Sequence, residues 1–276
     1  MKCKLCDTTG KKIFSKKILG KYDTDYLKCD KCGFIQTTHN NWLHEAYTSA
    51  ITSLDLGLLS RNIRLKWQIT PIIDAFYPGA KNFLDFAGGY GVFVRIMRDE
   101  GFNYFRHDPH CENLFAKHFD HTDSGLAHFD LATAFEVFEH FDDPLAGIQE
   151  VFSYAGDLIF TTELYDNVED LENWWYLAPE TGQHIAFYST RTLEYLAGRF
   201  NKKYYNKAGN IHIFSARSFS QTQLDYALRD IRQYKQFFGL LKRRLDFSKQ
   251  RTSLLEPDFN YVRSLLQKQQ LQENKK

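Results

Sequence analysis

The stretch FLDFAGGYGVF, residues 83–93, decides the fold of this chain. It begins as an apolar strand that carries an acid, Asp85, and passes through small residues into a helical pattern. Because glycine lacks a Cβ atom, a ligand can approach the backbone of such a turn closely. The stretch therefore predicts a strand–turn–helix unit that binds a nucleotide-like cofactor.

Two kinds of cofactor compete for a turn of this type. Nicotinamide and flavin dinucleotides require G-x-G-x-x-G, in which the helix N-terminus faces a pyrophosphate. Gly89 and Gly91 supply the first two glycines, but Val94 occupies the third position. A carboxylate at Asp85 would also repel a pyrophosphate. The dinucleotide pattern therefore fails.

Short apolar runs alternate with helical patterns from residue 82 onward. The predicted strands span residues 82–86, 102–107, 129–135 and 157–162, and the predicted helices 91–100, 110–119 and 144–154. This alternation is typical of βαβ units in a largely parallel sheet. Two further strands, 202–207 and 210–217, are so close in sequence that they can only form a hairpin. We therefore expect the sheet to end with an antiparallel strand.

The overall composition excludes some classes of protein. The 276 residues contain 35 lysines and arginines against 34 acidic residues, a net charge of +1, which argues against nucleic acid as the main partner. No apolar run approaches the roughly 18 residues of a membrane span, and the N-terminus lacks an apolar signal region. The expected location is the cytoplasm.

Four of the five cysteines form two C-x-x-C pairs, Cys3 with Cys6 and Cys29 with Cys32. A two-residue gap lets two thiolates reach one ion, and two such pairs complete the tetrahedron of structural zinc. The alternative is a redox motif or unused thiols. Four thiolate ligands leave no open coordination position, so we expect zinc here to be structural.

The chain divides into three predicted parts. A zinc-binding segment spans residues 1–60, the main α/β domain spans 61–218 and begins with a helix over 61–76, and a helical extension spans 219–276. In the extension, apolar residues recur at gaps of three and four from Leu224 to Leu245. This seam packs on its own domain or, alternatively, forms a homodimer through the 224–245 helix.

The turn resembles motif I of class I S-adenosylmethionine-dependent methyltransferases, whose pattern is roughly D/E-x-G-x-G-x-G. Asp85, Gly89 and Gly91 match it, and Ala87 stands at the first glycine position. The resemblance implies a Rossmann-like class I methyltransferase sheet, with the turn backbone against the methionine part and sugar of the cofactor. Asp85 would lie near the ammonium group. Asp108, at the end of the second strand, would accept the ribose hydroxyls, as acids at this place do in dinucleotide folds.

A second passage, residues 129–144, resembles the strand followed by E-H-x-x-D-P that many small-molecule methyltransferases share. Glu136, at the carboxyl end of the strand, should lie by the cofactor. The resemblance and the turn together imply these cofactor-binding residues: Asp85, Ala87, Gly88, Gly89, Gly91, Asp108, Pro109, Phe135 and Glu136.

A third passage, GQHIAFYS at residues 182–189, resembles the substrate side of the same family. It follows Trp174-Trp175-Tyr176, which form either a hydrophobic plug or a stacking wall for a sugar or ring. The leading candidate for the general base is His184, and the alternative for this histidine is a structural bond to a backbone carbonyl. The full set of candidate catalytic residues is His184, His140, Glu139 and Tyr188. Glu139 and His140 act either as acid and base or as a brace for the following helix.

These patterns predict an S-adenosylmethionine-dependent methyltransferase that acts on a small polar molecule, with O-methylation favoured over N- or C-methylation. The zinc-binding front end resembles that of sugar C-methyltransferases, which indicates a sugar, a nucleotide-linked sugar or a glycan precursor as substrate. Those enzymes carry a long additional C-terminal domain, whereas here only about 60 helical residues follow the sheet. The alternatives are a nucleic-acid-modifying methyltransferase that uses the zinc segment and the basic C-terminal helix, and a non-catalytic scaffold with this fold.

Overall fold

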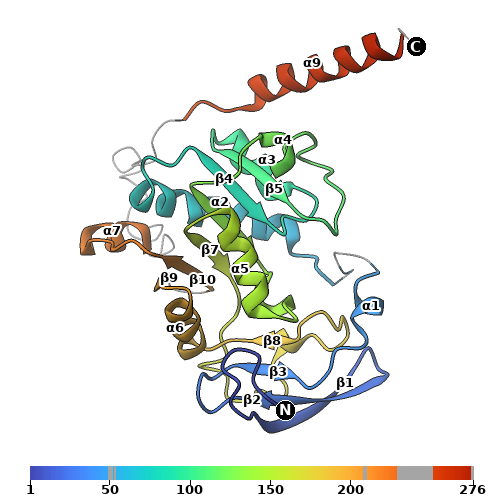
Figure 1. The fold of residues 1–276 in the computed structure, drawn as a ribbon, viewed down its shortest axis with the longest axis vertical. Helices are drawn as coiled ribbons and strands as arrows, with labels where there is room; N and C mark the ends of the chain where they lie inside the picture. The colour runs from blue at the N-terminus through green and yellow to red at the C-terminus, as the bar shows by residue number, and fades with distance from the viewer. Residues whose placement is uncertain (49–51, 53, 208–209, 229–250, 275–276) are drawn as a thin grey trace, which may run out of the picture.

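Two sheets organise the molecule in the computed structural model, which describes residues 1–48, 52, 54–207, 210–228 and 251–274. The large sheet has six strands in the order β5-β4-β6-β7-β10-β9, and the small sheet has four in the order β1-β2-β3-β8 (Figure 1). The large sheet is made of β4 (Asn82–Phe86), β5 (Asn103–His107), β6 (Leu131–Phe135), β7 (Leu158–Thr161), β9 (Lys203–Lys207) and β10 (Ile211–Ser215).

Strand direction in the large sheet follows the predicted pattern. Strands β5, β4, β6 and β7 pair in parallel, whereas β10 pairs antiparallel with both β7 and β9. The prediction of a Rossmann-like α/β sheet with a terminal antiparallel hairpin is therefore confirmed. The chain runs outward from β4 to β5 and then returns to β6 on the other side of β4. Ligands of open α/β sheets bind at such a reversal, beyond the carboxyl ends of the strands.

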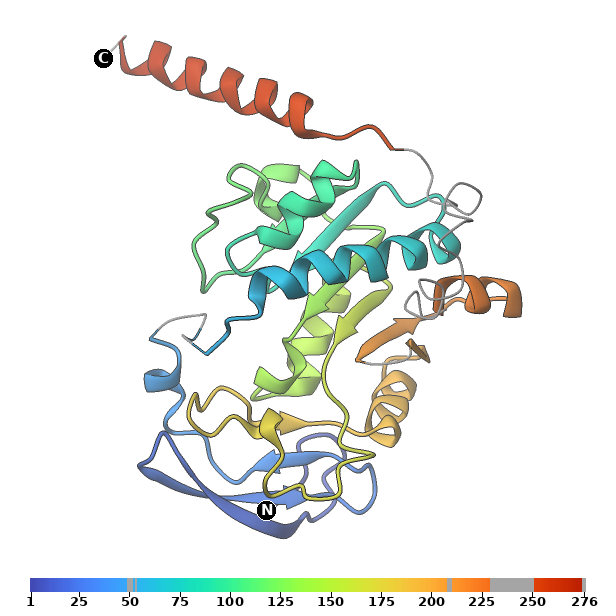
Figure 2. The ribbon, with the colours of Figure 1, turned by 180° about the vertical axis from the view of Figure 1, so that it is seen from behind.

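Helices cover both faces of this sheet. Helix α2 crosses one face together with α3 and α7, and α5 lies on the opposite face (Figures 1 and 2). The helices are α1 (Leu43–Ala46), α2 (Leu58–Phe76), α3 (Val92–Asp99), α4 (His121–Ser124), α5 (Pro144–Tyr154), α6 (Thr190–Arg199), α7 (Gln221–Leu228) and α9 (Leu255–Glu273), with 3-10 turns at η1 (Phe138–His140) and η2 (Trp175–Leu177). Among the described helices, none is both long enough and apolar enough to cross a bilayer.

Local sequence explains where several helices begin. Pro144 occupies the first turn of α5, and the Asp143 side chain accepts the N–H groups of the next two residues. At α7, the Ser220 N–H donates to the Gln223 side chain, and the Gln223 N–H donates to the Ser220 hydroxyl. Most of the predicted 224–245 seam falls in residues 229–250, outside the described part of the chain.

The predicted helix over 110–119 is wrong. This segment is irregular, and the only helix near it is the one-turn α4. The Asn113 side chain bonds the backbone of Ala116 in both directions, at 2.6 and 2.9 Å, and such local bonds compete with helical ones. The N–H groups of Leu114 and Phe115 donate to the Tyr90 carbonyl. The segment thereby closes against the glycine-rich turn instead of forming a helix.

The small sheet joins the N-terminal residues to the GQHIAFYS passage at residues 182–189. It consists of β1 (Lys11–Ile18), β2 (Tyr22–Lys28), β3 (Ile35–Thr37) and β8 (Ala186–Phe187), and β8 lies beside β3 in Figure 1. The Trp42 indole donates to the Gly182 carbonyl at 2.7 Å, and the Tyr165 hydroxyl donates to the Gly33 carbonyl. The N-terminal residues therefore support the backbone of the GQHIAFYS passage.

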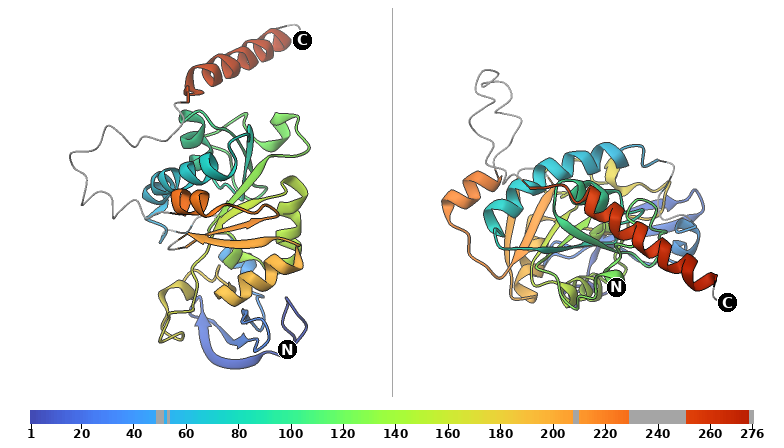
Figure 3. Two further views of the ribbon diagram at one scale, coloured as in Figure 1. Left: turned by 90° about the vertical axis from the view of Figure 1, so that its left-hand side faces the viewer. Right: turned by 90° about the horizontal axis from the view of Figure 1, so that it is seen from above.

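Helix α9 extends from the end of the molecule farthest from the N-terminus (Figures 1 and 3). Its start is fastened by Asp258, whose carboxylate accepts two bonds from the buried Arg98 guanidinium at 2.6 and 2.8 Å. Arg98 also donates to the Tyr104 carbonyl at 2.9 Å, so this ion pair joins α9 to the edge strand β5.

The Asp258→Ala variant tests this attachment. Removing one partner leaves the buried Arg98 without a carboxylate, so we expect the free energy of unfolding to fall by about 3 kcal/mol in urea denaturation. The control is Asp99→Ala, which removes only an exposed pair with Arg95 and should change stability by less than about 0.5 kcal/mol. Equal small losses in both variants would contradict the assignment.

Candidate active site

A cavity of about 1080 Å³ opens at the carboxyl ends of β4, β5 and β6. Its lining residues come from four regions of the sequence: described residues between Leu43 and Leu65, the strand ends of the large sheet with the residues that follow them, Gly147 and Glu150 of α5, and residues 175–184. The position is the reversal point at which this type of sheet binds its ligands. The cavity is therefore the candidate ligand-binding site of the sheet.

The glycine-rich turn forms one wall of the cavity. Ala87, Gly89 and Gly91 have φ values of +53°, +53° and +84°, the left-handed region that favours glycine. Ala87 thus adopts the conformation for which this position ordinarily needs glycine. At Gly88, an added Cβ would lie 2.8 Å from an Asp85 carboxylate oxygen. The turn consequently packs against Asp85 with no room for a side chain.

Two acidic side chains, Asp85 and Asp108, lie against the glycine-rich turn. The Asp85 carboxylate is buried and accepts a bond from the Thr133 hydroxyl at 2.7 Å. Burial raises the pKa of Asp85 to about 7, an effect that the Thr133 bond opposes and the Asp108 charge increases. The Asp108 carboxylate accepts the N–H groups of Gly89, at 2.9 Å, and His110, at 2.8 Å. Both acids line the cavity.

The end of β6 carries the next two candidates, Phe135 and Glu136, and both line the cavity. Glu136 has a φ of +55°, and its N–H donates to the Thr161 hydroxyl, which in turn donates to the Glu136 carboxylate at 2.7 Å. Burial raises the pKa of Glu136 to about 7, and the neighbouring Glu139 charge adds to the shift. Pro109 also reaches the cavity, whereas Gly91 lies behind its wall and caps α3.

Glu139, His140 and His184 come together beside the cavity, which His140 and His184 line. One ligand-type atom from each residue lies within 4.8 Å of the other two, and the two imidazole centroids are 4.9 Å apart. Burial raises the pKa of Glu139 to about 7 and lowers that of His140 to about 3. Burial also lowers the pKa of His184, so both imidazoles are neutral near pH 7.

Backbone carbonyls orient both rings. Nδ1 of His184 lies 2.6 Å from the Tyr176 carbonyl, and Nδ1 of His140 lies 3.1 Å from the Gln183 carbonyl. A carbonyl oxygen only accepts, so each Nδ1 carries the proton and each Nε2 carries the lone pair. The carbonyl bond that was the structural alternative for His184 is therefore present, and it leaves Nε2 as the basic nitrogen.

The other predicted substrate-side residues divide into two groups. Tyr188 is fully buried and its hydroxyl donates to the Phe138 carbonyl at 2.8 Å, so the structure does not bring it to the cavity. Trp174 packs against the apolar core of the small sheet. Trp175 is 74% exposed and lines the cavity. The aromatic run thus supplies a plug through Trp174 and a wall through Trp175.

Sequence reasoning missed two cavity residues. Tyr47 places its hydroxyl 3.0 Å from Nδ1 of His140, and Arg61 forms a bidentate pair with Asp55 at 2.7 and 2.9 Å. Tyr47, Arg61 and its partner Asp55 line the cavity together with His140. For Arg61, the sequence offered one signal, its position at the start of the predicted helix over 61–76. No pattern in the sequence pointed to Tyr47, because its partner lies 93 residues away.

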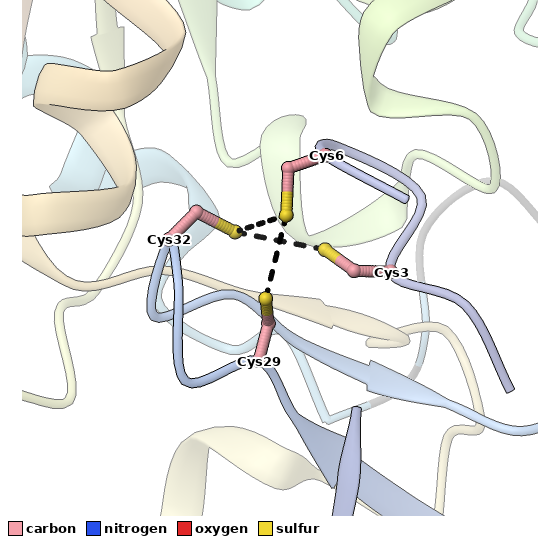
Figure 4. A group of neighbouring side chains, drawn as sticks. All are labelled: Cys3, Cys6, Cys29 and Cys32. Carbon is pink, nitrogen blue, oxygen red and sulfur yellow. Dashed lines mark hydrogen bonds between the residues drawn. The ribbon is translucent and has the colours of Figure 1, made fainter. Parts of the chain in front are cut away.

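The four cysteines of the two C-x-x-C motifs converge from two loops (Figure 4). The Sγ atoms of Cys6 and Cys29 are 3.4 Å apart, those of Cys3 and Cys32 are 3.6 Å apart, and those of Cys6 and Cys32 are 3.7 Å apart. A disulfide would need about 2.05 Å. A zinc tetrahedron with bonds of about 2.3 Å has edges of about 3.8 Å, so the cluster fits a zinc ion.

Comparison with solved structures finds partial likenesses at low identity. PigF with SAH has a TM-score of 0.45 and 12% identity over 63% of this chain and 61% of that one. The magnesium protoporphyrin IX methyltransferase ChlM from Synechocystis PCC 6803 with bound SAH has a TM-score of 0.39 and 14% identity over 63% and 91%. The N-terminal domain of EvdMO1 with SAH bound has a TM-score of 0.37 and 12% identity over 58% and 81%. No curated protein matches the chain significantly.

A family model provides the assignment. The model described as "Methyltransferase domain" matches residues 65–206, more than half of the chain. The match runs from α2 to β9 and includes the glycine-rich turn, Asp108 and the cluster of Glu139, His140 and His184. The chain therefore belongs to the methyltransferase-domain family and is an S-adenosylmethionine-dependent methyltransferase of the Rossmann-like class I fold.

Proposed function

We propose that this enzyme transfers the methyl group of S-adenosylmethionine to a hydroxyl of a small polar molecule, with a sugar, a nucleotide-linked sugar or a glycan precursor as the acceptor class. The observation that carries the proposal is one cavity that joins the glycine-rich turn to a cluster of proton-accepting side chains. A hydroxyl acceptor must lose its proton during transfer, and this cluster supplies groups for that step.

The cofactor would lie along the turn. The backbone of Ala87, Gly88 and Gly89 faces the cavity, and Asp108 would accept the ribose hydroxyls with its remaining lone pairs. Asp85 would pair with the ammonium group. A nearby cation favours the charged form of a buried carboxylate, so cofactor binding would lower the raised pKa of Asp85. Pro109, Phe135 and Glu136 would line the remainder of the cofactor site.

The acceptor would occupy the end of the cavity near His184, His140 and Trp175. The exposed indole of Trp175 offers apolar contact for a sugar ring. The acceptor oxygen attacks the methyl carbon in line with the breaking carbon–sulfur bond, and the electron pair of that bond remains on sulfur. The products are the methyl ether, S-adenosylhomocysteine and a proton that the cluster takes up. Holding oxygen and methyl in line supplies much of the acceleration.

The four cysteines would hold a structural zinc ion. Cys3, Cys6, Cys29 and Cys32 provide all four ligands, so the ion would fasten the loops that begin and end the first hairpin. Such thiols stay reduced in the cytoplasm, which is the location we propose.

The Asp108→Ala variant tests the cofactor site. It removes the acceptor of two ribose hydroxyls and loosens the Gly89 N–H, so affinity for S-adenosylhomocysteine should fall by about 100-fold. Isothermal titration calorimetry measures this, with the exposed Asp99→Ala as the control that should bind normally. Unchanged affinity in Asp108→Ala would refute the placement of the cofactor.

The His184→Ala variant tests the acceptor end. Losing a proton-accepting group should lower kcat by about 100-fold while leaving cofactor affinity unchanged. The exposed His128→Ala serves as the control. In the unaltered enzyme, kcat should rise with pH through about 7, because ionised Glu136 and Glu139 would stabilise the positive charge that an imidazole gains when it takes up the acceptor proton. Normal turnover of the variant would leave His184 a purely structural role.

Metal analysis tests the cysteine site. After dialysis against a weak chelator, we expect one tightly held zinc ion per chain, because four thiolates form a closed tetrahedron. Cys32→Ser should lose that ion, whereas Cys111→Ser should keep it because Cys111 lies outside the cluster. Folded protein with intact cysteines and no zinc would overturn the assignment.

A further inference from the structure

We infer that Glu139, His140 and His184 bind a divalent transition-metal ion at the acceptor end of the cavity. The site is separate from the four cysteines, and it is built on residues from η1 and from the passage before β8. The inference rests on the proposed function only in taking this end of the cavity as the acceptor side. It specifies how the acceptor oxygen is held and activated there.

The first observation is the state of Glu139. Its side chain is completely buried, and neither carboxylate oxygen has a hydrogen-bond partner among the described residues. The Thr162 and Tyr176 hydroxyls, 3.5 Å from one another, are near enough to oppose the rise in the pKa of Glu139, but neither makes a hydrogen bond of normal geometry to its carboxylate. Buried carboxylates in proteins are ordinarily paired, hydrogen-bonded or coordinated to metal ions. Glu139 therefore lacks a partner that a cation would supply.

The second observation is the orientation of the two histidines. Each ring donates its Nδ1 proton to a backbone carbonyl, that of Gln183 for His140 and that of Tyr176 for His184. Metal-binding histidines almost always donate the other ring N–H in this way, which fixes the tautomer and strengthens the metal-binding nitrogen. Nε2 of His140 lies 4.0 Å from a Glu139 oxygen. Both rings thus have the supporting bonds that metal ligands require.

The third observation is the set of metal-ligand atoms and the path by which an ion can reach them from the cavity. Two imidazoles and one carboxylate, with ligand-type atoms within 4.8 Å of one another, are the protein ligands of catalytic zinc and of open non-heme iron sites. His140 and His184 line the cavity, so an ion can enter from it and keep coordination positions open toward it. Zinc, iron(II) and cobalt(II) suit this set better than magnesium or calcium.

A bound ion would change how the acceptor is activated. The acceptor hydroxyl would coordinate at an open position, and the positive charge would lower its pKa, as zinc does for bound water. The hydroxyl proton would leave to solvent through the cavity. The oxygen would then attack the methyl carbon, and the carbon–sulfur bond would break with its electrons on sulfur. The histidines would act through the ion instead of as free bases.

Cobalt(II) titration tests the site directly. The four-cysteine site is first filled with one equivalent of zinc, and cobalt(II) is then added while visible absorption is recorded. We expect one cobalt ion per chain, with d–d bands but without the thiolate-to-cobalt charge transfer that binding at cysteines would produce. Glu139→Gln and His184→Ala should each weaken this binding by at least about tenfold.

Two cavity-lining variants outside the cluster serve as matched controls. Glu180→Gln and His44→Ala remove one carboxylate and one imidazole and should leave cobalt binding unchanged. No second ion in the unaltered protein, or normal binding by both folded cluster variants, would overturn the inference. The readout is metal binding, so the metal site and the proposed function can fail separately. Methyl transfer without a second ion would reject only the metal site. Cobalt binding without methyl transfer would reject only the acceptor assignment.

Discussion

The backbone of Ile185 joins the parts on which the candidate active site depends. Its carbonyl accepts the Thr37 N–H of β3 at 3.2 Å, and its N–H donates to the Glu139 carbonyl at 2.9 Å. Next to it, β8 completes the small sheet by pairing with β3. One residue therefore connects the cysteine-containing segment, the Glu139–His140 rim and the passage that carries His184. The positions of these side chains relative to one another follow from that connection.

This connection links the cysteine cluster to the backbone of the candidate active site. The two loops that it gathers begin and end the β1–β2 hairpin, and Cys32 is three residues before β3. The Tyr165 hydroxyl bonds the Gly33 carbonyl, so the second loop also contacts the main domain. An ion at the cysteines would stabilise β3, and through β3 it would stabilise the backbone on either side of His184.

Three buried acids lie in or beside the cavity, and their burial opposes stability. Asp85, Glu136 and Glu139 each have a pKa raised to about 7, and burial is the largest cause in all three. Burying a carboxylate without a compensating charge is unfavourable, so proteins keep such groups mainly at functional sites. A cationic cofactor beside Asp85 and a metal ion beside Glu139 would each supply a compensating charge. The cavity should therefore be more stable with these cationic ligands bound than without them.

Sequence alone determined the parts that depend on local pattern. Apolar runs and helix starts predicted β4, β7 and α5 closely, because alternation and capping are properties of neighbouring residues. The turn at residues 85–91 was predictable because glycine suits the positive φ angles that the local backbone adopts there. The predicted helix at 110–119 failed because the Asn113–Ala116 bonds and the Tyr90 carbonyl took its backbone partners.

Tertiary structure alone decided which side chains meet. Tyr47 bonds His140 across 93 residues, and β3 pairs with β8 across about 150 residues of intervening chain. Tyr188 and His184 stand four residues apart in one motif, yet only His184 reaches the cavity. A sequence pattern records which residues suit a strand, a turn or a buried face. It does not record the register between distant segments, which is set when the whole core packs together.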